Sequence, residues 1–98
     1  MIRHTVFFKF KVGISEIEKQ EFFKACNQLS LIPGIQNFEV VKEKSPKNDF
    51  EFGLLMVFDN STVYENYNTH PDHVLFVQNY WLKKVEDFIE IDFEPVVE

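Results

Sequence analysis

The chain has 98 residues, which is enough for one small domain and too few for a second hydrophobic core. Hydrophobic residues make up 45% of the chain, charged residues make up 27%, and there are 12 Phe, a globular composition that excludes general disorder. The formal net charge is -6 and the Lys and Arg residues are scattered, which argues against nucleic acid and membrane surfaces as partners.

The single cysteine, Cys26, lies inside a helical pattern, so we expect neither an intramolecular disulfide nor a thiolate metal site. The amino-terminal segment MIRHTVFF lacks the long apolar run of a signal peptide, and no segment approaches the length of a membrane span. These features predict a cytoplasmic protein.

The first third of the chain predicts a strand followed by a helix. Residues 2 to 12 alternate, which is typical of a strand with one strongly apolar face, and His4 lies on that face. Ser15 is followed three residues later by Glu18, the spacing of a capping box at the start of a helix. The Pro-Gly pair at residues 33 to 34 then ends the helical pattern.

The middle of the chain predicts a hairpin. Strand patterns at residues 35 to 43 and 50 to 59 are joined by the polar turn KSPKND. The second of these strands carries apolar side chains on both faces, with Leu55 and Val57 on the face that the helices cannot cover. Because this face, which includes Phe7, would be an exposed apolar patch in a monomer, we expect a homodimer with the two sheets back to back.

The last third predicts two helical segments and a final strand. Thr62 and Glu65 repeat the capping-box spacing, and the helix that they begin is interrupted at Pro71. A helical pattern resumes over residues 72 to 87, followed by a strand pattern at residues 88 to 96. The apolar stripe of the resumed helix consists of Val74, Val77, Trp81 and Val85.

The predicted element order is therefore β-α-β-β-α-β. With right-handed crossovers, this order gives a four-stranded antiparallel sheet with two helical segments on one face, which is the ferredoxin-like plan. We expect an α+β fold in a single domain over residues 1 to 98, without internal repeats.

The stretch YNTHPDHVLF, residues 67 to 76, gathers a tyrosine and two histidines around a proline. His73 falls in the first turn of the later helix, where the helix dipole disfavours an imidazolium and leaves a neutral ring that accepts a proton. A bend at Pro71 would turn the phenol of Tyr67 towards it, giving the proton donor and acceptor needed to enolise or condense a carbonyl compound. The same pair would also serve as a buried hydrogen bond between two helical segments, and both interpretations stay open.

Further residues are predicted to line a ligand pocket near this pair. His4 lies among apolar neighbours on the strand face that meets the helices, so its ring nitrogens need polar partners or a ligand there. Aromatic side chains at helical spacing usually form core, but many large rings over a small sheet predict imperfect packing and an apolar gap. The aromatic residues predicted to line this gap are Phe22, Phe23, Phe76 and Tyr80.

A metal site is an alternative for the same stretch. His70, Asp72 and His73 have a spacing that suits two imidazole ligands, but a third ligand is uncertain and adjacent residues on a helix point apart. We therefore predict no metal and no cofactor, and we expect His70 to be a solvated turn residue.

Four segments together resemble one protein family. They are IRHTVFFKFK, IPGIQNFEV, YNTHPDHVLFV and VEDFIEIDFE, and over essentially the whole chain they resemble the stress-responsive dimeric α/β-barrel domain (Dabb) family. The resemblance implies a ferredoxin-like fold and a homodimer whose two sheets form a barrel. It also implies a stress-linked role, since some members are stress-associated proteins.

The resemblance extends to the proposed site. In a plant polyketide cyclase of this family, a tyrosine and a histidine close a linear polyketide by an aldol step, and Tyr67 and His73 match that pair. His4 matches a pocket histidine, and the FF pair at residues 22 to 23 matches one on the first helix of the cyclase. The departure is Trp81, which does not fall where the cyclase has its pocket tryptophan, in a last helix that is one residue longer.

We therefore expect a homodimer that binds a small apolar or carbonyl ligand between sheet and helices. The alternatives are an enzyme of the polyketide cyclase or cofactor-independent oxygenase type, using Tyr67 and His73, and a purely structural assembly protein. An internal apolar cavity reached by His4, Tyr67 and His73 would favour the first two expectations. A fully packed interior would favour assembly.

Overall fold

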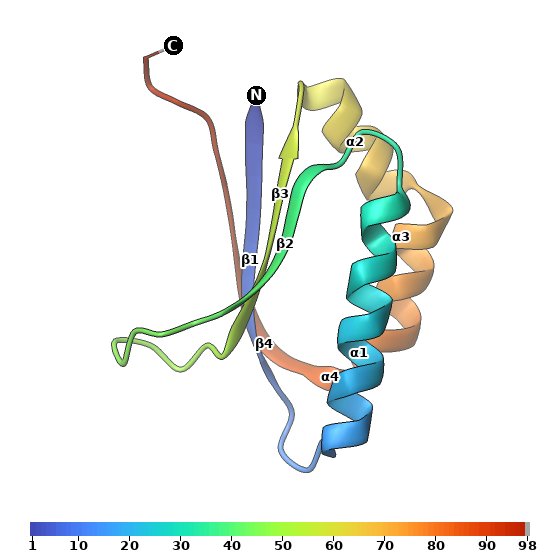
Figure 1. Ribbon diagram of the computed structural model, residues 1–98, viewed down its shortest axis with the longest axis vertical. Helices are drawn as coiled ribbons and strands as arrows, with labels where there is room; N and C mark the ends of the chain where they lie inside the picture. The colour runs from blue at the N-terminus through green and yellow to red at the C-terminus, as the bar shows by residue number, and fades with distance from the viewer. Residues whose placement is uncertain (98) are drawn as a thin grey trace.

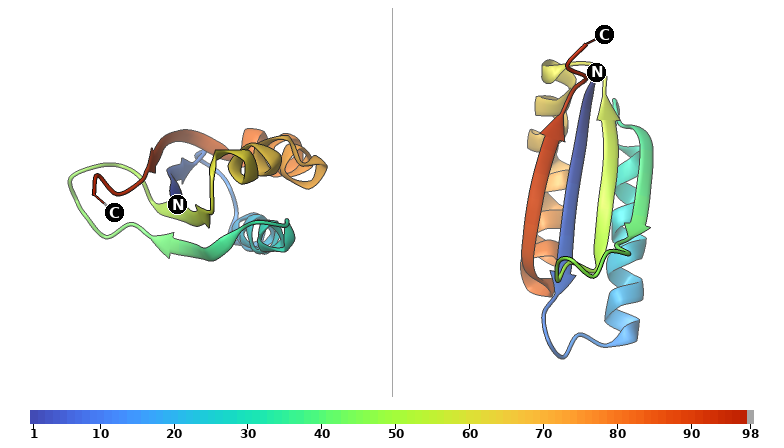
Figure 2. Two further views of the ribbon diagram at one scale, coloured as in Figure 1. Left: turned by 90° about the horizontal axis from the view of Figure 1, so that it is seen from above. Right: turned by 90° about the vertical axis from the view of Figure 1, so that its left-hand side faces the viewer.

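The computed structural model, which describes residues 1 to 97, contains a four-stranded antiparallel sheet with its helices on one face (Figure 1). Glu98, the last residue of the predicted domain, lies outside the described residues. The strands lie in the order β2-β3-β1-β4, as seen from the open face of the sheet in Figure 2. Their bounds are β1 (Ile2–Phe10), β2 (Gln36–Lys42), β3 (Phe52–Phe58) and β4 (Val85–Phe93). The predicted α+β, ferredoxin-like fold is confirmed.

The helices form two groups that lie side by side over the same face (Figures 1 and 2). The first group is α1 (Glu16–Gln28) with the 3-10 turn η1 (Leu29–Leu31). The second group is α2 (Ser61–Thr69), α3 (Pro71–Phe76), the π-helix η2 (Val77–Trp81) and α4 (Leu82–Lys84). Within residues 1 to 97, no helix has both the length and the apolar character needed to span a membrane.

Short polar motifs fix where the helices begin. The predicted capping box of α1 is confirmed: the Ser15 Oγ accepts from the Glu18 backbone N–H at 3.1 Å, and the Glu18 carboxylate accepts from the Ser15 backbone N–H at 3.3 Å. At α2 the cap is Asn60, whose Oδ1 accepts from the Val63 backbone N–H at 3.0 Å. The capping box predicted at Thr62 is wrong, because an asparagine before it already satisfies the free N–H groups.

The later helical region is less regular than its pattern suggested. It ends at Lys84 rather than near residue 87, because β4 begins at Val85. Val74, predicted in the buried stripe, is 40% exposed, whereas Phe76 is 7% exposed. The prediction failed at Val74 because the π-helical turn that follows is wider than an α-turn and changes the helical phase.

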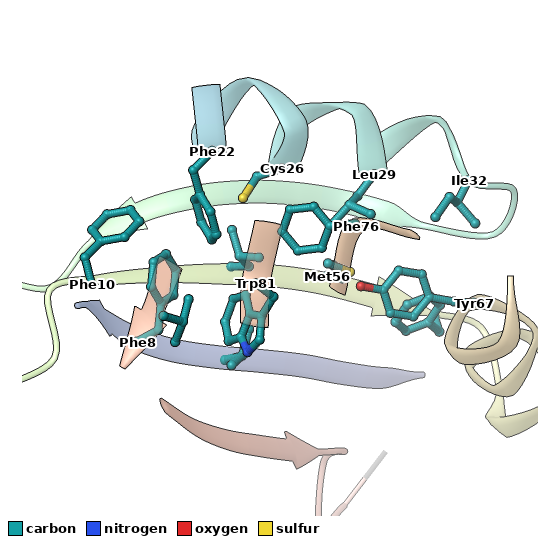
Figure 3. Close-up of a cluster of buried hydrophobic side chains, with 14 residues drawn as sticks. Phe8, Phe10, Phe22, Cys26, Leu29, Ile32, Met56, Tyr67, Phe76 and Trp81 are labelled. Atoms are coloured by element: carbon teal, nitrogen blue, oxygen red, sulfur yellow. The ribbon is translucent and has the colours of Figure 1, made fainter. Parts of the chain in front are cut away.

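The core fills the layer between the sheet and the helices (Figure 3). Phe22 and Cys26 of α1 point down onto the sheet, where they meet Phe8 and Met56 (Figure 3). These four side chains are almost completely buried, and burial raises the pKa of the Cys26 thiol. The cysteine is therefore part of the apolar core, as its position in the helical pattern predicted.

The opposite face of the sheet carries apolar side chains that no helix covers. On β4, Ile89, Ile91 and Phe93 are 44%, 51% and 46% exposed. Phe7 pairs with Ile89 on one side and with Gly53 on the other. A Cβ at Gly53 would lie only 2.5 Å from the Phe7 ring, so this ring lies flat across the neighbouring strand. This face of the sheet therefore carries an apolar surface, as predicted.

Candidate ligand pocket and acid-base site

A pocket of about 210 Å³ lies between the sheet and the second helical group. Leu82 and Phe88 are 61% and 48% exposed and mark its mouth beside β4, whereas His4 and Tyr67 are buried at its floor. The apolar lining residues are Val6, Leu29, Leu54, Phe76, Val77, Trp81, Leu82 and Phe88, and the polar ones are His4, Tyr67, His73 and Glu90. The pocket therefore combines apolar walls with a few polar groups at defined places.

Tyr67 is buried near the end of α2, and its hydroxyl points into the layer between sheet and helices (Figure 3). Within residues 1 to 97, no side chain or backbone group forms a hydrogen bond with this hydroxyl. Its oxygen is also not among fully buried polar atoms that lack a partner, so the oxygen itself is in contact with open space. It is therefore open to the pocket. Burial raises the pKa of the phenol, so at neutral pH it keeps its proton and acts as a donor.

His73 lies half-buried in the first turn of α3, with its ring centroid 4.4 Å from that of Tyr67. Its Nδ1 is 3.0 Å from the backbone carbonyl oxygen of Asn68. Because a carbonyl oxygen only accepts, Nδ1 carries the hydrogen and Nε2 is the acceptor of the neutral ring. Burial lowers the pKa of His73, an effect that the bond to Asn68 only partly offsets, so the neutral form prevails at pH 7.

The geometry of this pair differs from a simple hydrogen-bonded link between two helices. His73 bonds to the backbone at Asn68, and the Tyr67 and His73 rings meet at an interplanar angle of 41°. The phenol keeps its hydrogen for another acceptor, and the imidazole keeps Nε2 for another donor. A donor and an acceptor are thus presented together on one apolar pocket.

His4 reaches the same pocket from β1 and is held by two polar side chains. Its Nδ1 is 2.5 Å from Asp92 Oδ1 and 2.9 Å from the hydroxyl oxygen of Tyr64. The Tyr64 hydroxyl donates to Asp92 Oδ2 at 2.7 Å. Since the carboxylate accepts, Nδ1 of His4 carries a hydrogen, and in the neutral ring Nε2 is the acceptor.

Tyr64, Glu90 and Asp92 also lie at the site, although their place there was not predicted from the sequence. In β4 the acidic residues alternate with Ile89 and Ile91, and Asp92 pairs directly with His4 across the sheet. Glu90 and Asp92 could have been found from the alternation of the strand, because they are two residues apart and therefore lie on the same face of β4, the face that turns towards the helices. For Tyr64 the signal was its place one helical turn before Tyr67.

Three of the predicted lining residues lie elsewhere. Phe22 is completely buried behind the pocket wall, with its ring centroid 5.7 Å from that of Phe76 and 6.1 Å from that of Trp81. The Phe23 ring packs 5.9 Å from Phe22 and does not line the pocket. Tyr80 stacks on the outer side of Phe76 with ring centroids 6.0 Å apart. Of the predicted aromatic residues, Phe76 lines the pocket, and Trp81 lines it too despite its departure from the cyclase pattern.

His70 is separate from the pocket and has a local structural role. Its Nδ1 accepts from the Asp72 backbone N–H at 3.1 Å, which caps α3 after the break at Pro71. It is more exposed than His4, as predicted, although it is not fully solvated. Across residues 1 to 97, no group of three or more His, Cys, Asp or Glu side chains is arranged to hold a metal ion.

Comparisons with known proteins agree with this architecture. The family model described as stress responsive A/B barrel domain (Dabb) matches residues 2 to 95. Olivetolic acid cyclase from Cannabis sativa is 30% identical over 101 residues, covering 96% of this chain and 96% of the cyclase.

Solved structures give the same result at the level of the fold. A Dabb-family protein with a ferredoxin-like fold from Mesorhizobium loti is 44% identical, with a TM-score of 0.91, over 97% of this chain and 96% of that chain. A dimeric protein of unknown function with a ferredoxin-like fold from Bacteroides fragilis has a TM-score of 0.74 at 24% identity, over 95% of this chain and 94% of that chain.

Proposed function

Because the chain belongs to the stress responsive A/B barrel domain (Dabb) family, we propose that it binds a small, largely apolar carbonyl compound in the pocket and transfers a proton on it. One observation carries this proposal: a protonated phenol, Tyr67, and a neutral imidazole, His73, meet on an apolar pocket of about 210 Å³. The likeness to a polyketide cyclase, 30% identical over nearly the whole chain, supports a carbonyl compound as the ligand.

In the proposed reaction, the carbonyl oxygen of the ligand lies against the Tyr67 hydroxyl and its α-carbon lies against His73 Nε2. The imidazole takes a proton from the α-carbon, and the electron pair of that C–H bond forms the carbon–carbon double bond of an enolate. The phenol donates a hydrogen bond to the oxygen, on which the negative charge develops. The enolate then takes back a proton or attacks a second carbonyl group of the same molecule.

The hydrogen on Nδ1 of His73 and the hydroxyl hydrogen of Tyr67 are placed as this proton transfer requires. The bond from Nδ1 to the carbonyl of Asn68 persists when Nε2 gains a proton, so the ring keeps its orientation throughout. The apolar walls exclude water, which strengthens the hydrogen bond to the developing oxyanion. His4, held by Asp92, offers a second acceptor to a polar group of the ligand.

The test is exchange of the methyl protons of acetophenone for deuterium in D2O, followed by NMR. Tyr67→Phe removes the donor and His73→Ala removes the base, and each should slow the catalysed exchange by roughly 10²- to 10⁴-fold. The double variant should be little slower than the worse single variant, because the two groups act as a unit. His70→Asn is the matched control, since it removes a histidine but keeps a side chain that caps a helix.

Two results separate catalysis from packing. Ligand binding should survive both substitutions better than exchange does, because the apolar walls remain. If both single variants keep full exchange rates but lose thermal stability, the Tyr67 and His73 pair is a packing device and the proposal is wrong.

We also infer that the protein is a homodimer joined through the open face of the sheet. The exposed side chains of β4 and the Phe7 ring over Gly53 support this, because a contiguous exposed apolar surface usually marks a site of association. A shallow hollow of about 520 Å³ beside Phe7, Val41 and Ile89 offers room for side chains of a second copy. The dimeric relative from Bacteroides fragilis shares the fold that would form such a pair.

Light scattering tests the dimer. Leu55→Lys would bury an unpaired charge between the two sheets, at a cost of several kcal/mol, and should reduce the mass from dimer to monomer. Val74→Lys is the matched control, because it places the same charge on the exposed side of α3. A wild-type protein that is already a monomer at micromolar concentration would contradict the inference.

A further inference from the structure

Glu90 is the charged residue that lines the pocket. It lies on β4 opposite Val6, on the strand face that carries Asp92 and Phe88, and it is exposed at the mouth. No lysine or arginine is among the lining residues within the described chain, residues 1 to 97. A ligand that enters the pocket therefore passes a carboxylate and meets no cationic side chain on the walls.

The Glu90 carboxylate is also available to a ligand. Its neighbours on β4 have partners, since Asp92 binds His4 at 2.5 Å and Glu86 lies 3.5 Å from the Lys9 ammonium. Among residues 1 to 97, no side chain forms a hydrogen bond or an ion pair with the Glu90 carboxylate. Its hydrogen-bonding capacity is thus left to solvent or to a bound molecule.

The negative charge of Glu90 influences the pKa values of Tyr67 and His73 in the pocket. Burial is the main cause of the raised pKa of Tyr67, and the negative charge of Glu90 adds to it. For His73, burial lowers the pKa and the same carboxylate opposes that shift. A carboxylate that acts on both groups also acts on a ligand held between them and the mouth.

Two consequences follow for a ligand whose carbonyl group lies at Tyr67 and His73. A carboxylate or phosphate at its other end would lie beside the Glu90 carboxylate at the mouth, and like charges repel there. A hydroxyl or ammonium group at that end would donate a hydrogen bond to the carboxylate. The apolar walls between the floor and the mouth suit a hydrocarbon or aromatic body.

We propose that Glu90 selects carbonyl compounds by the group at the end remote from the carbonyl; this inference rests on the proposed carbonyl-binding function. Neutral or cationic compounds with a hydroxyl or ammonium donor at that end are bound, and compounds with a carboxylate or phosphate there are rejected. The substrate class is then a free aldehyde or ketone with a polar, non-acidic tail.

Four acetophenones that differ in the para substituent test this selection. They are acetophenone, 4-hydroxyacetophenone, 4-(aminomethyl)acetophenone and 4-acetylbenzoate, each titrated into the protein with the His73 ring signals followed by NMR. The wild-type protein should bind the hydroxyl and ammonium compounds about tenfold more tightly than acetophenone, and 4-acetylbenzoate most weakly.

Glu90→Gln removes the charge while keeping the shape of the side chain. It should weaken binding of the ammonium compound and strengthen binding of 4-acetylbenzoate, each by about tenfold, so that the two affinities converge. Glu65→Gln, an exposed position on α2 outside the pocket, makes the same change in net charge and should keep the wild-type order.

The outcomes separate this inference from its premise. If acetophenone binds at the His73 ring but Glu90→Gln and wild type rank the four compounds alike, the selection by Glu90 is wrong and the carbonyl pocket stands. If none of the four compounds binds at millimolar concentration, the carbonyl-binding function itself is overturned, and this inference with it.

Discussion

Both ends of the layer between sheet and helices contain aromatic side chains, but one end is closely packed and the other borders the pocket. At the end where β1 finishes, the rings of Phe8, Phe10 and Phe22 are packed with centroids 5.1 to 5.5 Å apart. We call this the aromatic end. At the polar end, where β1 begins, the corresponding residues are His4, Tyr64, Tyr67, His73 and Asp92.

The difference shows how polar atoms limit packing. Phenyl rings need only contact, so the rings of the aromatic end pack directly against one another, and Figure 3 shows Phe8, Phe10 and Phe22 grouped together. A phenol or an imidazole must also satisfy its polar atoms, so its orientation is set by hydrogen bonds rather than by the best fit. The polar end therefore leaves space for a pocket, and the close packing of the aromatic end offsets the stability that this space costs.

The largest effect is expected from a comparison of two truncated rings, one buried in the aromatic end and one at the mouth of the pocket. Phe22→Ala at the aromatic end should lower the free energy of unfolding by about 3–5 kcal/mol, because a completely buried ring leaves a cavity. Phe88→Ala, at the exposed mouth of the pocket, should cost about 1 kcal/mol. Urea unfolding at one fixed protein concentration measures both. Equal losses would show that the ring at the pocket mouth is packed as closely as the ring in the aromatic end.

A smaller effect is expected for Asp92→Asn, which weakens the support of His4. The change should cost about 1 kcal/mol, since Asp92 is partly exposed and the amide oxygen can still accept. The informative measurement is the tautomer of His4 from its ring 15N shifts, whose preference for a hydrogen on Nδ1 should weaken, because a neutral amide oxygen accepts less strongly than a carboxylate. An unchanged tautomer would mean that Asp92 does not set the orientation of the ring.

Tyr64→Phe should have a smaller effect again. The phenyl ring would keep its stacking on Phe58, where the ring centroids are 4.9 Å apart, while the hydrogen bond to Asp92 is lost. We expect a loss of about 0.5 kcal/mol in the free energy of unfolding, and a His4 tautomer like that of the wild type. A loss as large as that of Phe22→Ala would show that the polar network, not the aromatic end, dominates stability.

The smallest effect is a pH dependence at the polar end. The pKa of His73 is lowered from 6.5 by burial, so just below pH 6.5 the unfolded chain binds more protons at this residue than the folded chain does. This contribution to stability is therefore complete above pH 6.5 and is lost as the pH falls from 6.5 towards the folded pKa. His73→Gln should remove it, as seen by comparing urea unfolding at pH 5.5 and 7.5. An unchanged difference would mean that His73 is not buried as a neutral ring.

The sequence was sufficient for the fold because its strongest signals are local. The alternation in β1 placed His4 on the inner face, the Ser15 capping box placed the start of α1, and the four family segments pointed to the Dabb family that the family match confirms. Each of these signals depends on a few neighbouring residues. Their agreement left one topology.

The pocket was harder to predict because it depends on what the packing leaves empty. His4 and Asp92 are 88 positions apart in the chain, and only the register of β1 with β4 brings them together. Phe22 and Phe23 look identical to pocket residues in a helical pattern, yet they meet the far end of β1. The periodicity of apolar residues and the composition predict which side chains face the core, but not which of these side chains contact one another.

The π-helix η2 gives the pocket a simple route to change during evolution. Its wide turn holds one residue more than an α-turn would, and Val77 and Trp81 of this turn line the pocket. Losing a single codon here would restore α geometry and rotate the side chains on one side of the turn by about 100° relative to those on the other. The element order and the sheet would be kept, because the next segment is a short helix that leads into an edge strand. Trp81, whose ring centroid lies 5.0 Å from that of Phe8 and 6.1 Å from that of Phe22, would repack against the sheet and α1. Relatives with the same fold can thus acquire different pocket walls by gaining or losing one residue, together with local repacking around Trp81.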